Sequence, residues 1–526
     1  MKKNRIKFTQ QLPSKLIILL FIFLYFFIRI SIIKNNQFSF FYDQARDAII
    51  SRRIIENGDL KVQGPSASGT NDTIYHGVFY YYFIAPLYTF SNGNPQIVMY
   101  AIILLNSLSI IPYYILLREL FKNESVAILS SFLLSISAEQ ALATTWLSNP
   151  NLANFFIILF YFLLWKTFFQ KKHYLIPLAI VLAINVQIAF WLIFLLGSIF
   201  LSLYYLKFVE KKNFFSIFKL KEVLWAIFAF IIGISSMIYT QLKLYRIGIF
   251  TFGQLGEATL RSKSFDLQTL YTIFNLALDK LTRNYFPILP MLSFLVFIIA
   301  FVNLIKISKK QKWFLAIWLC APFCVLAFHA RRAVSFFMTY EVLAIIILAI
   351  LLVKIWQKRD LFHRTIVVSL LLLFIFSNKA LINEYHQEKK SKHIYQEGVL
   401  LSDQLDLINY TYSVSNGSPF SISSYTNPLY YNTTWSYLYS WYGNQKYNYK
   451  PSFFGPSQEG VFGGDLLEQS INPNKNHFVI LEPNVGAESL YQEQYLNKQN
   501  SLGNIIEQKS FGKINIIYIE VEKQIN

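Results

Sequence analysis

The chain has 526 residues, of which 54% are hydrophobic and only 15% are charged. A soluble globular protein carries about 25% charged residues, so this composition excludes an ordinary soluble domain and indicates a polytopic membrane protein. The net charge is +19, but most Lys and Arg residues fall between apolar runs, which favours membrane topology and anionic lipid over nucleic acid as its cause. The two cysteines, Cys320 and Cys324, exclude a disulfide framework and a thiolate metal site.

Apolar runs recur along the chain, and a transmembrane helix needs about 20 such residues. The sequence predicts about eleven transmembrane helices, which start near Leu16, Pro95, Ser125, Leu152, Tyr174, Phe190, Val223, Phe286, Trp313, Val334 and Thr365. The fifth and sixth run together, and Asn185 and Gln187 mark the expected break between them. The first, Leu16 to Ile33, follows a basic start and precedes no small-residue cleavage site, which predicts an uncleaved span with a cytoplasmic N-terminus.

Alternate connections between these spans are short and basic, as cytoplasmic loops are. Their cations are Arg118, Lys122, Lys166, Lys171, Lys172, Lys207, Lys211, Lys212, Lys219, Lys221, Lys306, Lys309, Lys310, Lys312, Lys354, Lys358, Arg359 and Arg364. Three connections of the opposite set are unusual for their length or charge: residues 34 to about 94, residues 243 to 284, and "HARRA" at 329 to 333. We therefore expect these three loops on the extracytoplasmic side.

The first outer loop contains two segments that favour the membrane surface. Ala45, Ala48, Ile49, Arg52 and Ile55 follow helical spacing, which predicts an amphipathic helix lying at the interface. The run "HGVFYYYFIAPLYTF", residues 76 to 90, is aromatic and too short to span comfortably. It is typical of an interfacial or re-entrant segment, in which irregular backbone lines a cavity.

After about Asn383 the composition becomes polar, with short apolar runs at "PFSISSY", "HFVILE" and "INIIYIEVE" and helical stretches between them. These patterns predict a small α/β domain. We therefore expect a transmembrane module over residues 1–382 and an α/β domain over residues 383–526. The parity of the spans places this domain outside the cytoplasm.

Asp43 and Asp47 lie one helical turn apart just beyond the first span, with Arg46 beside them. A carboxylate there can accept a proton from an attacking hydroxyl, which is general-base catalysis. The alternative is structural: Asp43 caps the helix, and Asp47 interacts favourably with the positive helix N-terminus. The residues alone leave both interpretations open.

Several motifs occur in order along this part of the chain. "YDQARDA" opens the first outer loop, "GDL", "GP", "YHG" and "GNP" follow, and "TTWLSNPN" occupies residues 144 to 151. Together they resemble the GT-C integral-membrane glycosyltransferases, and most closely the family 39-like branch of protein O-mannosyltransferases and aminoarabinose transferases. The likeness covers about the first 200 residues; further on it rests on the layout of apolar segments and the position of the C-terminal domain.

The resemblance implies a GT-C fold and inverting transfer of a sugar from a polyprenyl-phosphate donor. Asp43 takes the role of the family's acidic residue that activates the acceptor. Relatives often have Asp-Glu at this point, whereas this chain has Asp43 followed by Gln44, and Asp47 could substitute. The resemblance requires no cofactor and leaves room for a divalent metal ion, although the sequence assigns no residue to a metal.

The donor's phosphate would need cations, and guanidinium groups bind phosphate through two parallel hydrogen bonds. Arg331 and Arg332 are our first choice, and their alternative partners are anionic lipid headgroups. The second-choice candidates, from the long outer loop at 243 to 284, are Lys243, Arg246 and Arg283.

Further candidates for substrate binding lie in two of the motifs. They are Tyr75, His76, Trp146, Asn149 and Asn151, together with Asp47 and Arg46 from the opening stretch. The structural alternatives are a hydrogen-bonded histidine, an interfacial tryptophan and a turn formed by Asn-Pro.

The sequence therefore predicts an inverting glycosyltransferase (hexosyl or pentosyl) of the plasma membrane, with its active site on the extracytoplasmic face. Its partners would be the lipid-linked donor, a glycan, lipid or protein acceptor, and membrane lipids, with no nucleic acid. Two other classes compete. A lipid-linked sugar transporter or flippase would be expected to have charges in mid-span and two related halves. A non-catalytic envelope scaffold would use Asp43 only as a cap.

Overall fold

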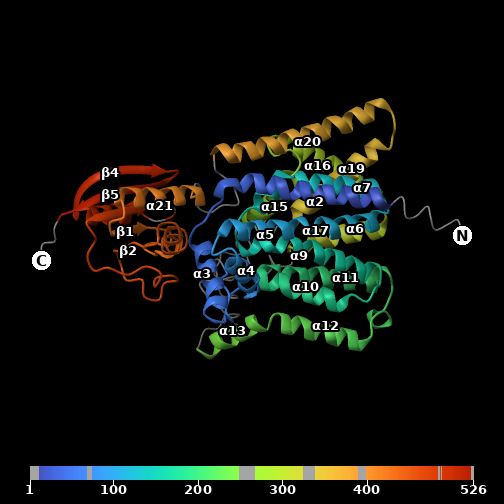
Figure 1. The fold of residues 1–526 in the computed structure, drawn as a ribbon. Coiled ribbons are helices and arrows are strands. Elements are labelled where there is room, and N and C mark those ends of the chain that lie inside the picture. The colour runs from blue at the N-terminus through green and yellow to red at the C-terminus, as the bar shows by residue number, and fades with distance from the viewer. Residues whose placement is uncertain are drawn as a thin grey trace.

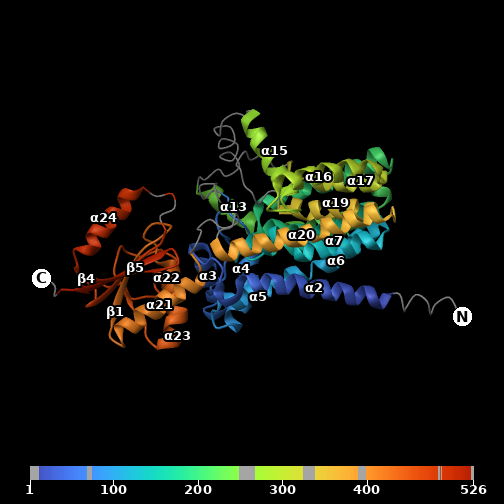
Figure 2. The ribbon, with the colours of Figure 1, turned by 90° about the horizontal axis from the view of Figure 1, so that it is seen from above.

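The computed structural model describes residues 11–67, 74–247, 267–323, 338–388, 399–483, 486 and 488–522. A bundle of long helices occupies one part of the molecule, and a smaller domain with a β-sheet lies at one end of it (Figure 1). The helices α3 (Tyr42–Glu56) and α4 (Phe79–Phe90) lie at the junction between these two parts (Figures 1 and 2).

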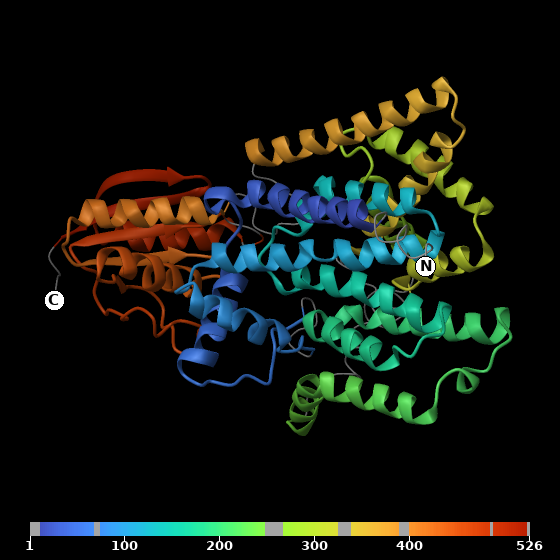
Figure 3. The same ribbon diagram turned by 45° about the vertical axis from the view of Figure 1, so that its right-hand side comes forward.

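The bundle forms from the apolar runs of the sequence. Its elements are α2 (Gln11–Ile33), α5 (Pro95–Ser107), α6 (Ile110–Phe121), α7 (Glu124–Ile136), α8 (Ala138–Ala143), α9 (Asn149–Leu164), η2 (Trp165–Phe169), α10 (Leu175–Ile188), η3 (Phe190–Phe194), α11 (Leu195–Tyr204), η4 (Tyr205–Val209), α12 (Leu220–Gly233), α13 (Ser235–Arg246), α15 (Leu267–Thr282), α16 (Pro290–Asn303), α17 (Lys309–Cys320), α19 (Met338–Trp356) and α20 (Leu361–Glu388). The last of these, in orange, lies on the outside of the bundle (Figure 3).

Six helical stretches in the described residues are long and apolar enough to cross a membrane. A seventh is added if α12 and α13, which meet at a 60° bend, form one broken span. Three shorter apolar helices, α7, α10 and the stretch from Pro290 to Lys306, accompany them. The chain is thus an integral multi-pass membrane protein with the predicted helical fold, whereas the count of eleven spans stays a prediction.

The break between α7 and α8 lies at Ser137, whose backbone is extended (φ −64°, ψ 121°). Such a break leaves backbone groups without helical partners inside the bundle, and these must be satisfied by other groups. Arg29 of α2, fully buried, donates to the carbonyl oxygen of Ser135 (2.7 Å). The Ala138 N–H donates to Asn378 Oδ1 of α20 (2.8 Å). The two polar side chains therefore stabilise the interrupted helix.

The predicted amphipathic helix is confirmed as α3. Its buried face includes Ala45, Ala48 and Ile49, as the spacing indicated, but Ile55 is exposed and Ile54 is buried instead. The reason is that α3 packs against α4 on one side and α22 of the sheet domain on another, so its buried stripe is wider than an interfacial helix needs. The aromatic run forms α4, a helix of 12 residues.

The smaller domain contains a five-stranded mixed sheet in the order β2-β1-β3-β5-β4. Its elements are α21 (Leu401–Ser415), β1 (Phe420–Tyr425), α22 (Thr433–Leu438), η8 (Tyr439–Gly443), α23 (Asn444–Tyr447), β2 (Ser452–Phe453), β3 (Asn476–Leu481), α24 (Ser489–Asn500), β4 (Gly503–Phe511) and β5 (Ile514–Val521). β1 is parallel to β2 and β3, and β5 is antiparallel to β3 and β4. The three predicted apolar strands are confirmed as β1, β3 and β5.

The sequence did not predict β4, because its side chains are mostly exposed and it lies at the edge of the sheet. The proposed boundary after residue 382 falls within α20, which continues to Glu388. The division into modules 1–382 and 383–526 therefore stays a prediction.

Direct contacts fix the sheet domain to the junction. The Tyr437 hydroxyl donates to the carbonyl oxygen of Gly93 (2.5 Å), and Gln404 Nε2 donates to the carbonyl oxygen of Phe40 (2.8 Å). Gly93 has a positive φ of 88°, and a Cβ there would come within 2.8 Å of the Trp441 ring. The "GNP" motif is thus a site where the sheet domain closely approaches the loop between α4 and α5.

Candidate active site

The start of α3 leaves Asp43 free of any capping role. The N-cap residue is Phe41, whose backbone is extended (φ −141°, ψ −162°). The side chain of Gln44 accepts a hydrogen bond from the Phe41 N–H (3.2 Å), so it satisfies the end of the helix. The alternative in which Asp43 is the N-cap is therefore wrong. Asp43 lies in the first turn, where a carboxylate interacts favourably with the helix dipole.

Two carboxylates and one guanidinium group form the centre of the site. Arg46 Nη1 donates to Asp43 Oδ1 (2.7 Å), while its Nε and Nη2 donate to Asp47 Oδ1 (2.9 and 2.7 Å). The Asp43 side chain is 52% exposed, whereas that of Asp47 is 5% exposed. Among the described residues no hydrogen bond reaches Asp43 Oδ2. Within the described part of the chain, Asp43 Oδ2 thus accepts no hydrogen bond, whereas Asp43 Oδ1 is held by Arg46.

The surroundings of the buried groups shift their pKa values. Burial raises the pKa of Asp47 to about 6, although Arg46 opposes that shift. The pKa of Arg46 lies well above its ordinary value, because Asp47 and Asp43 outweigh the opposing effect of burial. Burial, followed by the charge of Asp47, raises the pKa of Tyr81 of α4. The charges of α3 and the phenol of α4 therefore form one cluster.

His76 lies near this cluster in its neutral form. Its Nδ1 accepts a hydrogen bond from the Phe190 N–H (3.0 Å), and the Trp191 ring lies edge-on at 5.1 Å between centroids. Burial and, as a smaller cause, the charge of Arg46 lower the pKa of His76 to about 3. Because Nδ1 is an acceptor, the proton of the neutral ring is on Nε2. His76 has the structural contacts of the alternative interpretation, and its second nitrogen is a donor.

Gln187 connects the "YHG" motif to the bundle. Gly77 N–H donates to the Gln187 carbonyl oxygen (2.8 Å), and a Cβ on Gly77 would overlap the Gln187 side chain. Gln187 Nε2 donates in turn to the Gly233 carbonyl oxygen at the bend between α12 and α13 (2.8 Å). Tyr75 forms an isolated β-bridge with Ser66, next to the "GP" motif. The motif therefore needs glycine because the loop packs directly on the end of α10.

The "TTWLSNPN" segment forms the turn between α8 and α9. Asn149 Nδ2 donates to the Ile188 carbonyl oxygen (2.7 Å), two residues before the backbone N–H bound by His76. Asn151 is buried and donates to the carbonyl oxygens of Thr144 (2.8 Å) and Trp146 (2.9 Å), so it stabilises the turn. The indole N–H of Trp146 is buried and has no hydrogen-bond partner among the residues that the structure describes. Asn149 therefore lies close to the His76 loop, whereas Asn151 faces the turn.

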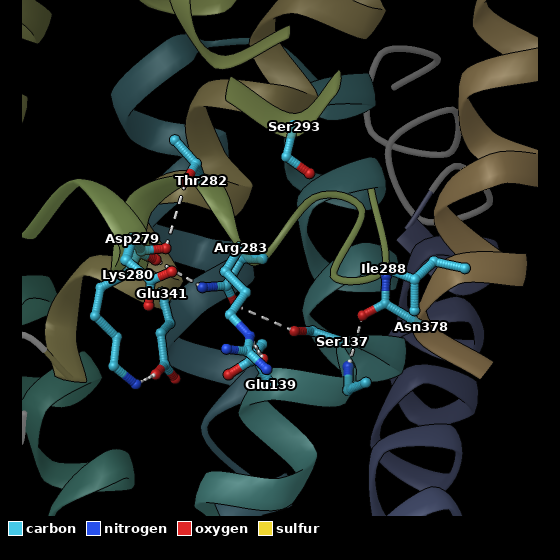
Figure 4. A network of polar contacts seen from close by, with 12 residues as sticks. Ser137, Glu139, Asp279, Lys280, Thr282, Arg283, Ile288, Ser293, Glu341 and Asn378 are labelled. Atoms are coloured by element: carbon cyan, nitrogen blue, oxygen red, sulfur yellow. Dashed lines mark hydrogen bonds and ion pairs between the residues drawn. The ribbon is translucent and has the colours of Figure 1, made fainter. Parts of the chain in front are cut away.

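The described part of the structure does not show the phosphate-binding candidates at a common site. Arg331 and Arg332 lie outside the described ranges. Lys243 and Arg246 are exposed near the end of α13. Arg283 forms an ion pair with Glu139 of α8, and next to it Lys280 pairs with Glu341 of α19 (Figure 4). Arg283 is thus neutralised by a carboxylate in this structure.

The described residues contain no group of three or more His, Cys, Asp and Glu side chains that could hold a metal ion. Asp43 and Asp47 share the guanidinium of Arg46. Arg46 therefore supplies the positive charge between the two carboxylates.

Tyr431 is a residue of the site that the sequence did not indicate. Its ring lies 5.8 Å from that of Tyr42, the neighbour of Asp43, and the guanidinium of Arg46 lies 5.7 Å from the Tyr42 ring. Tyr431 comes from the loop after β1 and is 42% exposed. No local signal could reveal it, because the contact joins the sheet domain to a helix hundreds of residues earlier in the chain.

These features define a polytopic membrane protein in which the charged helix α3 lies between the helical bundle and a C-terminal α/β domain. No protein-family model matches the chain, and no curated protein matches it. Among solved structures it is similar to ArnT from Cupriavidus metallidurans bound to undecaprenyl phosphate, with a TM-score of 0.56 and 11% identity over 95% of this chain and 97% of that one. The same enzyme in the apo state gives a TM-score of 0.57 and 10% identity, over 96% and 98%.

ArnT, an aminoarabinose transferase, has the GT-C fold. The likeness extends over nearly the whole of both chains, so the sheet domain belongs to the shared architecture as well as the bundle. The GT-C fold predicted from the motifs is confirmed. At this level of identity the likeness concerns the fold, and the residues of the site rest on the geometry above.

Proposed function

We propose that this protein is an inverting glycosyltransferase that moves a sugar from a polyprenyl-phosphate donor to an acceptor hydroxyl, with Asp43 as general base. The observation that carries the proposal is the state of Asp43. It is exposed at the junction of the bundle and the sheet domain, with one oxygen fixed by Arg46 and the other uncommitted. A general base must reach the proton that it abstracts, and the exposure of this carboxylate supports that role.

The shared fold supports a lipid-linked donor. The ArnT structure of the same fold was solved with undecaprenyl phosphate bound, and a donor of this class would carry its sugar on such a phosphate. The apolar helices around the junction suit a long isoprenoid chain, because hydrocarbon is stable against an apolar surface within the bilayer. The basic connections at the other end of the bundle support an extracytoplasmic position for Asp43.

The reaction balances with one proton transfer. The acceptor hydroxyl donates a hydrogen bond to Asp43 Oδ2, and its oxygen attacks the anomeric carbon on the face opposite the phosphate. The new carbon–oxygen bond forms as the bond to phosphate breaks, so the configuration inverts. The proton passes to Asp43, and the polyprenyl phosphate departs as a dianion.

Asp43 is a better candidate than Asp47 because of access. The pKa of Asp47, about 6, would suit proton transfer near neutral pH. However, the side chain of Asp47 is buried, and its Oδ1 accepts two hydrogen bonds from Arg46. We assign Asp47 and Arg46 to holding Asp43 in position.

The departing dianion needs cations, and we assign this role to Arg331 and Arg332. Replacing either with Ala should weaken donor binding, and Lys should rescue only in part because it lacks the planar fork of Arg. Binding of an immobilised polyprenyl-phosphate sugar measures this directly. Normal donor binding by both Ala variants would assign the pair to lipid headgroups instead.

The acceptor is proposed to approach from the sheet domain. Tyr42 and Tyr431 place two aromatic rings beside Asp43, and aromatic faces pack well against the apolar face of a sugar ring or a lipid. We also propose that four further residues contact the substrates: Tyr75, His76, Trp146 and Asn149.

Purified protein incubated with a panel of polyprenyl-phosphate sugars and candidate acceptors tests the function. Mass spectrometry should detect glycosylated acceptor and free polyprenyl phosphate without added nucleotide sugar. Efficient transfer from a soluble nucleotide sugar, with no lipid intermediate, would overturn the donor. Movement of intact lipid-linked sugar across vesicles without transfer would instead identify a transporter, and the absence of both activities would favour a scaffold.

A further inference from the structure

Three helical stretches, α6, η2 and η4, end on the side of the bundle away from the sheet domain (Figure 1). Each is followed within two residues by a lysine with a positive φ, namely Lys122 (50°), Lys171 (60°) and Lys211 (53°). Residues other than glycine rarely adopt this left-handed conformation, and glycine is usual just after a helix C-terminus. A lysine at all three positions is therefore unexpected from backbone preference alone.

Two of these ends are built identically. The π-helical turns η2 and η4 follow α9 and α11, and each is closed by the same pair of backbone bonds. Gln170 and Lys172 donate to Trp165 and Lys166 (both 3.0 Å) in the first. In the second, the equivalent donors and acceptors are Glu210 to Tyr205 (3.0 Å) and Lys212 to Leu206 (2.9 Å). The repeated geometry projects two adjacent lysines from each turn.

The first turn of α17 bonds to two of these ends, and an ion pair links the third. Lys310 Nζ donates to the carbonyl oxygen of Phe169, at the end of η2. Its neighbour Gln311 donates through Nε2 to the carbonyl oxygen of Leu120 (2.8 Å), two residues before Lys122. Lys171 forms an ion pair with Glu210, which also accepts a hydrogen bond from the Tyr205 hydroxyl (2.8 Å). The lysines therefore come from three separate connections and from the first turn of α17, and they lie close together.

The charge at this place is not balanced. Contact with the Lys171 ammonium lowers the pKa of Lys212. Burial lowers the pKa of Lys310, and the charges of Lys171, Lys122 and Lys212 lower it further, against the opposing effect of Glu210. The charges that act most strongly on Lys310 are thus three further ammonium groups and one carboxylate, Glu210. We name Lys122, Lys171, Lys212 and Lys310 the lysine cluster.

The surface beside the lysine cluster is apolar and aromatic. Phe200, Tyr204 and Phe208 follow one stripe along α11 and η4, and each is at least half exposed. The Tyr204 ring lies 4.7 Å from that of Phe208 and 6.2 Å from that of Trp313. Exposed aromatic rings next to cations are typical of the level at which lipid headgroups meet acyl chains.

We propose that the lysine cluster binds the phosphate of an anionic phospholipid, whose acyl chains lie along the Phe200–Tyr204–Phe208 stripe. The site is separate from the Asp43 site and does not depend on the transfer reaction. The surplus charge attracts a phosphate, the convergence of three connections localises it, and the apolar stripe selects a lipid over a free anion. Occupancy would relieve the repulsion between Lys171 and Lys212 and hold the ends of α6, α9 and α11 together.

Native mass spectrometry of the full-length protein released from nanodiscs tests the proposal. The discs contain phosphatidylglycerol and phosphatidylcholine in equal amounts, and the phosphatidylglycerol retained per protein molecule is measured. The test variant is Lys122→Gln/Lys212→Gln, in which both side chains are exposed. The matched control is Lys219→Gln/Lys221→Gln, which removes the same charge from an exposed connection at the same end of the bundle.

The natural chain should retain phosphatidylglycerol in preference to phosphatidylcholine. Each lysine near a headgroup contributes on the order of 1 kcal/mol of attraction, so the test pair should weaken retention at least about tenfold, while the control pair should change it less than about twofold. Phe208→Ala, which leaves every lysine in place, should also reduce retention. Thermal unfolding of each variant verifies that it is folded.

If the test and control pairs lost equal amounts of retained phosphatidylglycerol, the lipid would be attracted by general positive charge and not by the lysine cluster. That result would overturn the proposal. The same conclusion would follow if the natural chain showed no preference between the two lipids. Displacement of the lipid by excess inorganic phosphate would assign the site to a free anion and likewise contradict it.

Discussion

Charged side chains are arranged differently at the two ends of the helical bundle. Next to the sheet domain, Arg46 is shared by Asp43 and Asp47, Lys280 pairs with Glu341, and Arg283 pairs with Glu139 (Figure 4). At the far end, the lysine cluster keeps a positive surplus around Glu210. The comparison indicates that charges paired one to one fix the geometry of the bundle around a site, whereas a local excess of positive charge can attract a partner from outside.

The largest effect should come from breaking a buried pair. Replacing Lys280 with Met leaves the Glu341 carboxylate buried, with only Gln140 as a hydrogen-bond donor in the described residues. Removing one partner of a buried pair destabilises by about 3–5 kcal/mol, so Lys280→Met should lower the free energy of unfolding by that amount. Denaturant unfolding in detergent measures it.

The matched control for this change is Lys212→Met at the far end, where the side chain is exposed. It should alter the free energy of unfolding by less than about 0.5 kcal/mol. If both substitutions had equal effects, the contrast between paired and surplus charge would have no energetic basis.

A smaller loss is expected from Gly77→Ala. The added Cβ would overlap the Gln187 side chain, and forcing extra atoms into a packed position costs about 1–3 kcal/mol. The change should also disturb the neighbouring His76 loop, which amide hydrogen exchange of residues 74 to 79 would detect. Gly58→Ala, whose Cβ would meet no atom within 4 Å, is the control for space, although its positive φ adds strain. A larger loss at Gly58 than at Gly77 would contradict the packing argument.

His76 should make stability depend on pH with a definite sign. Its folded pKa, about 3, lies below the ordinary value of 6.5, so the unfolded chain binds more protons between these values. The stability that His76 contributes is therefore complete above pH 6.5 and is lost as the pH falls toward 3, with a slope of at most about 1.4 kcal/mol per pH unit.

His76→Asn tests this dependence, because the Asn side-chain oxygen can accept the Phe190 hydrogen bond but does not titrate. Unfolding measured between pH 4 and 7 should lose part of its slope in the variant. An unchanged slope would show that His76 is solvated.

The smallest effect should follow from the exposed ion pair between Arg53 of α3 and Asp465 of the sheet domain (2.5 Å). Such surface pairs contribute about 0–1 kcal/mol, so Asp465→Asn should barely change the free energy of unfolding. A loss above about 2 kcal/mol, outside that range, would mean that the sheet domain is held mainly by charge rather than by the buried contacts of Tyr437 and Gln404.

The sequence predicted much of the fold because the strongest signals are periodic and local. Apolar runs marked the helices, and the spacing of Ala45, Ala48 and Ile49 marked α3. The edge strand β4 was not predicted because it buries little of its surface. Ile55 was wrongly expected on the buried face of α3, because the sequence does not reveal that α22 covers this helix.

The site could be predicted only in part for the same reason. Asp43, Arg46 and Asp47 are neighbours on one helix, so their contact follows from spacing. The difference between an exposed Asp43 and a buried Asp47, and the approach of Tyr431 and Tyr81, depend on elements that are distant in the chain. Asn151 had the residue type of a ligand, but the structure uses it to close a turn.

The rate of sugar transfer by Asp43→Asn tests the central claim most directly. Asn keeps the size of the side chain but cannot take a proton, so turnover with a polyprenyl-phosphate sugar should fall at least about a hundredfold while the protein stays folded and inserted. Asp59→Asn, which changes a half-buried carboxylate of the same loop paired with Lys61, should keep normal turnover and serves as the control. Near-normal transfer by Asp43→Asn would contradict the assignment of Asp43 as the general base.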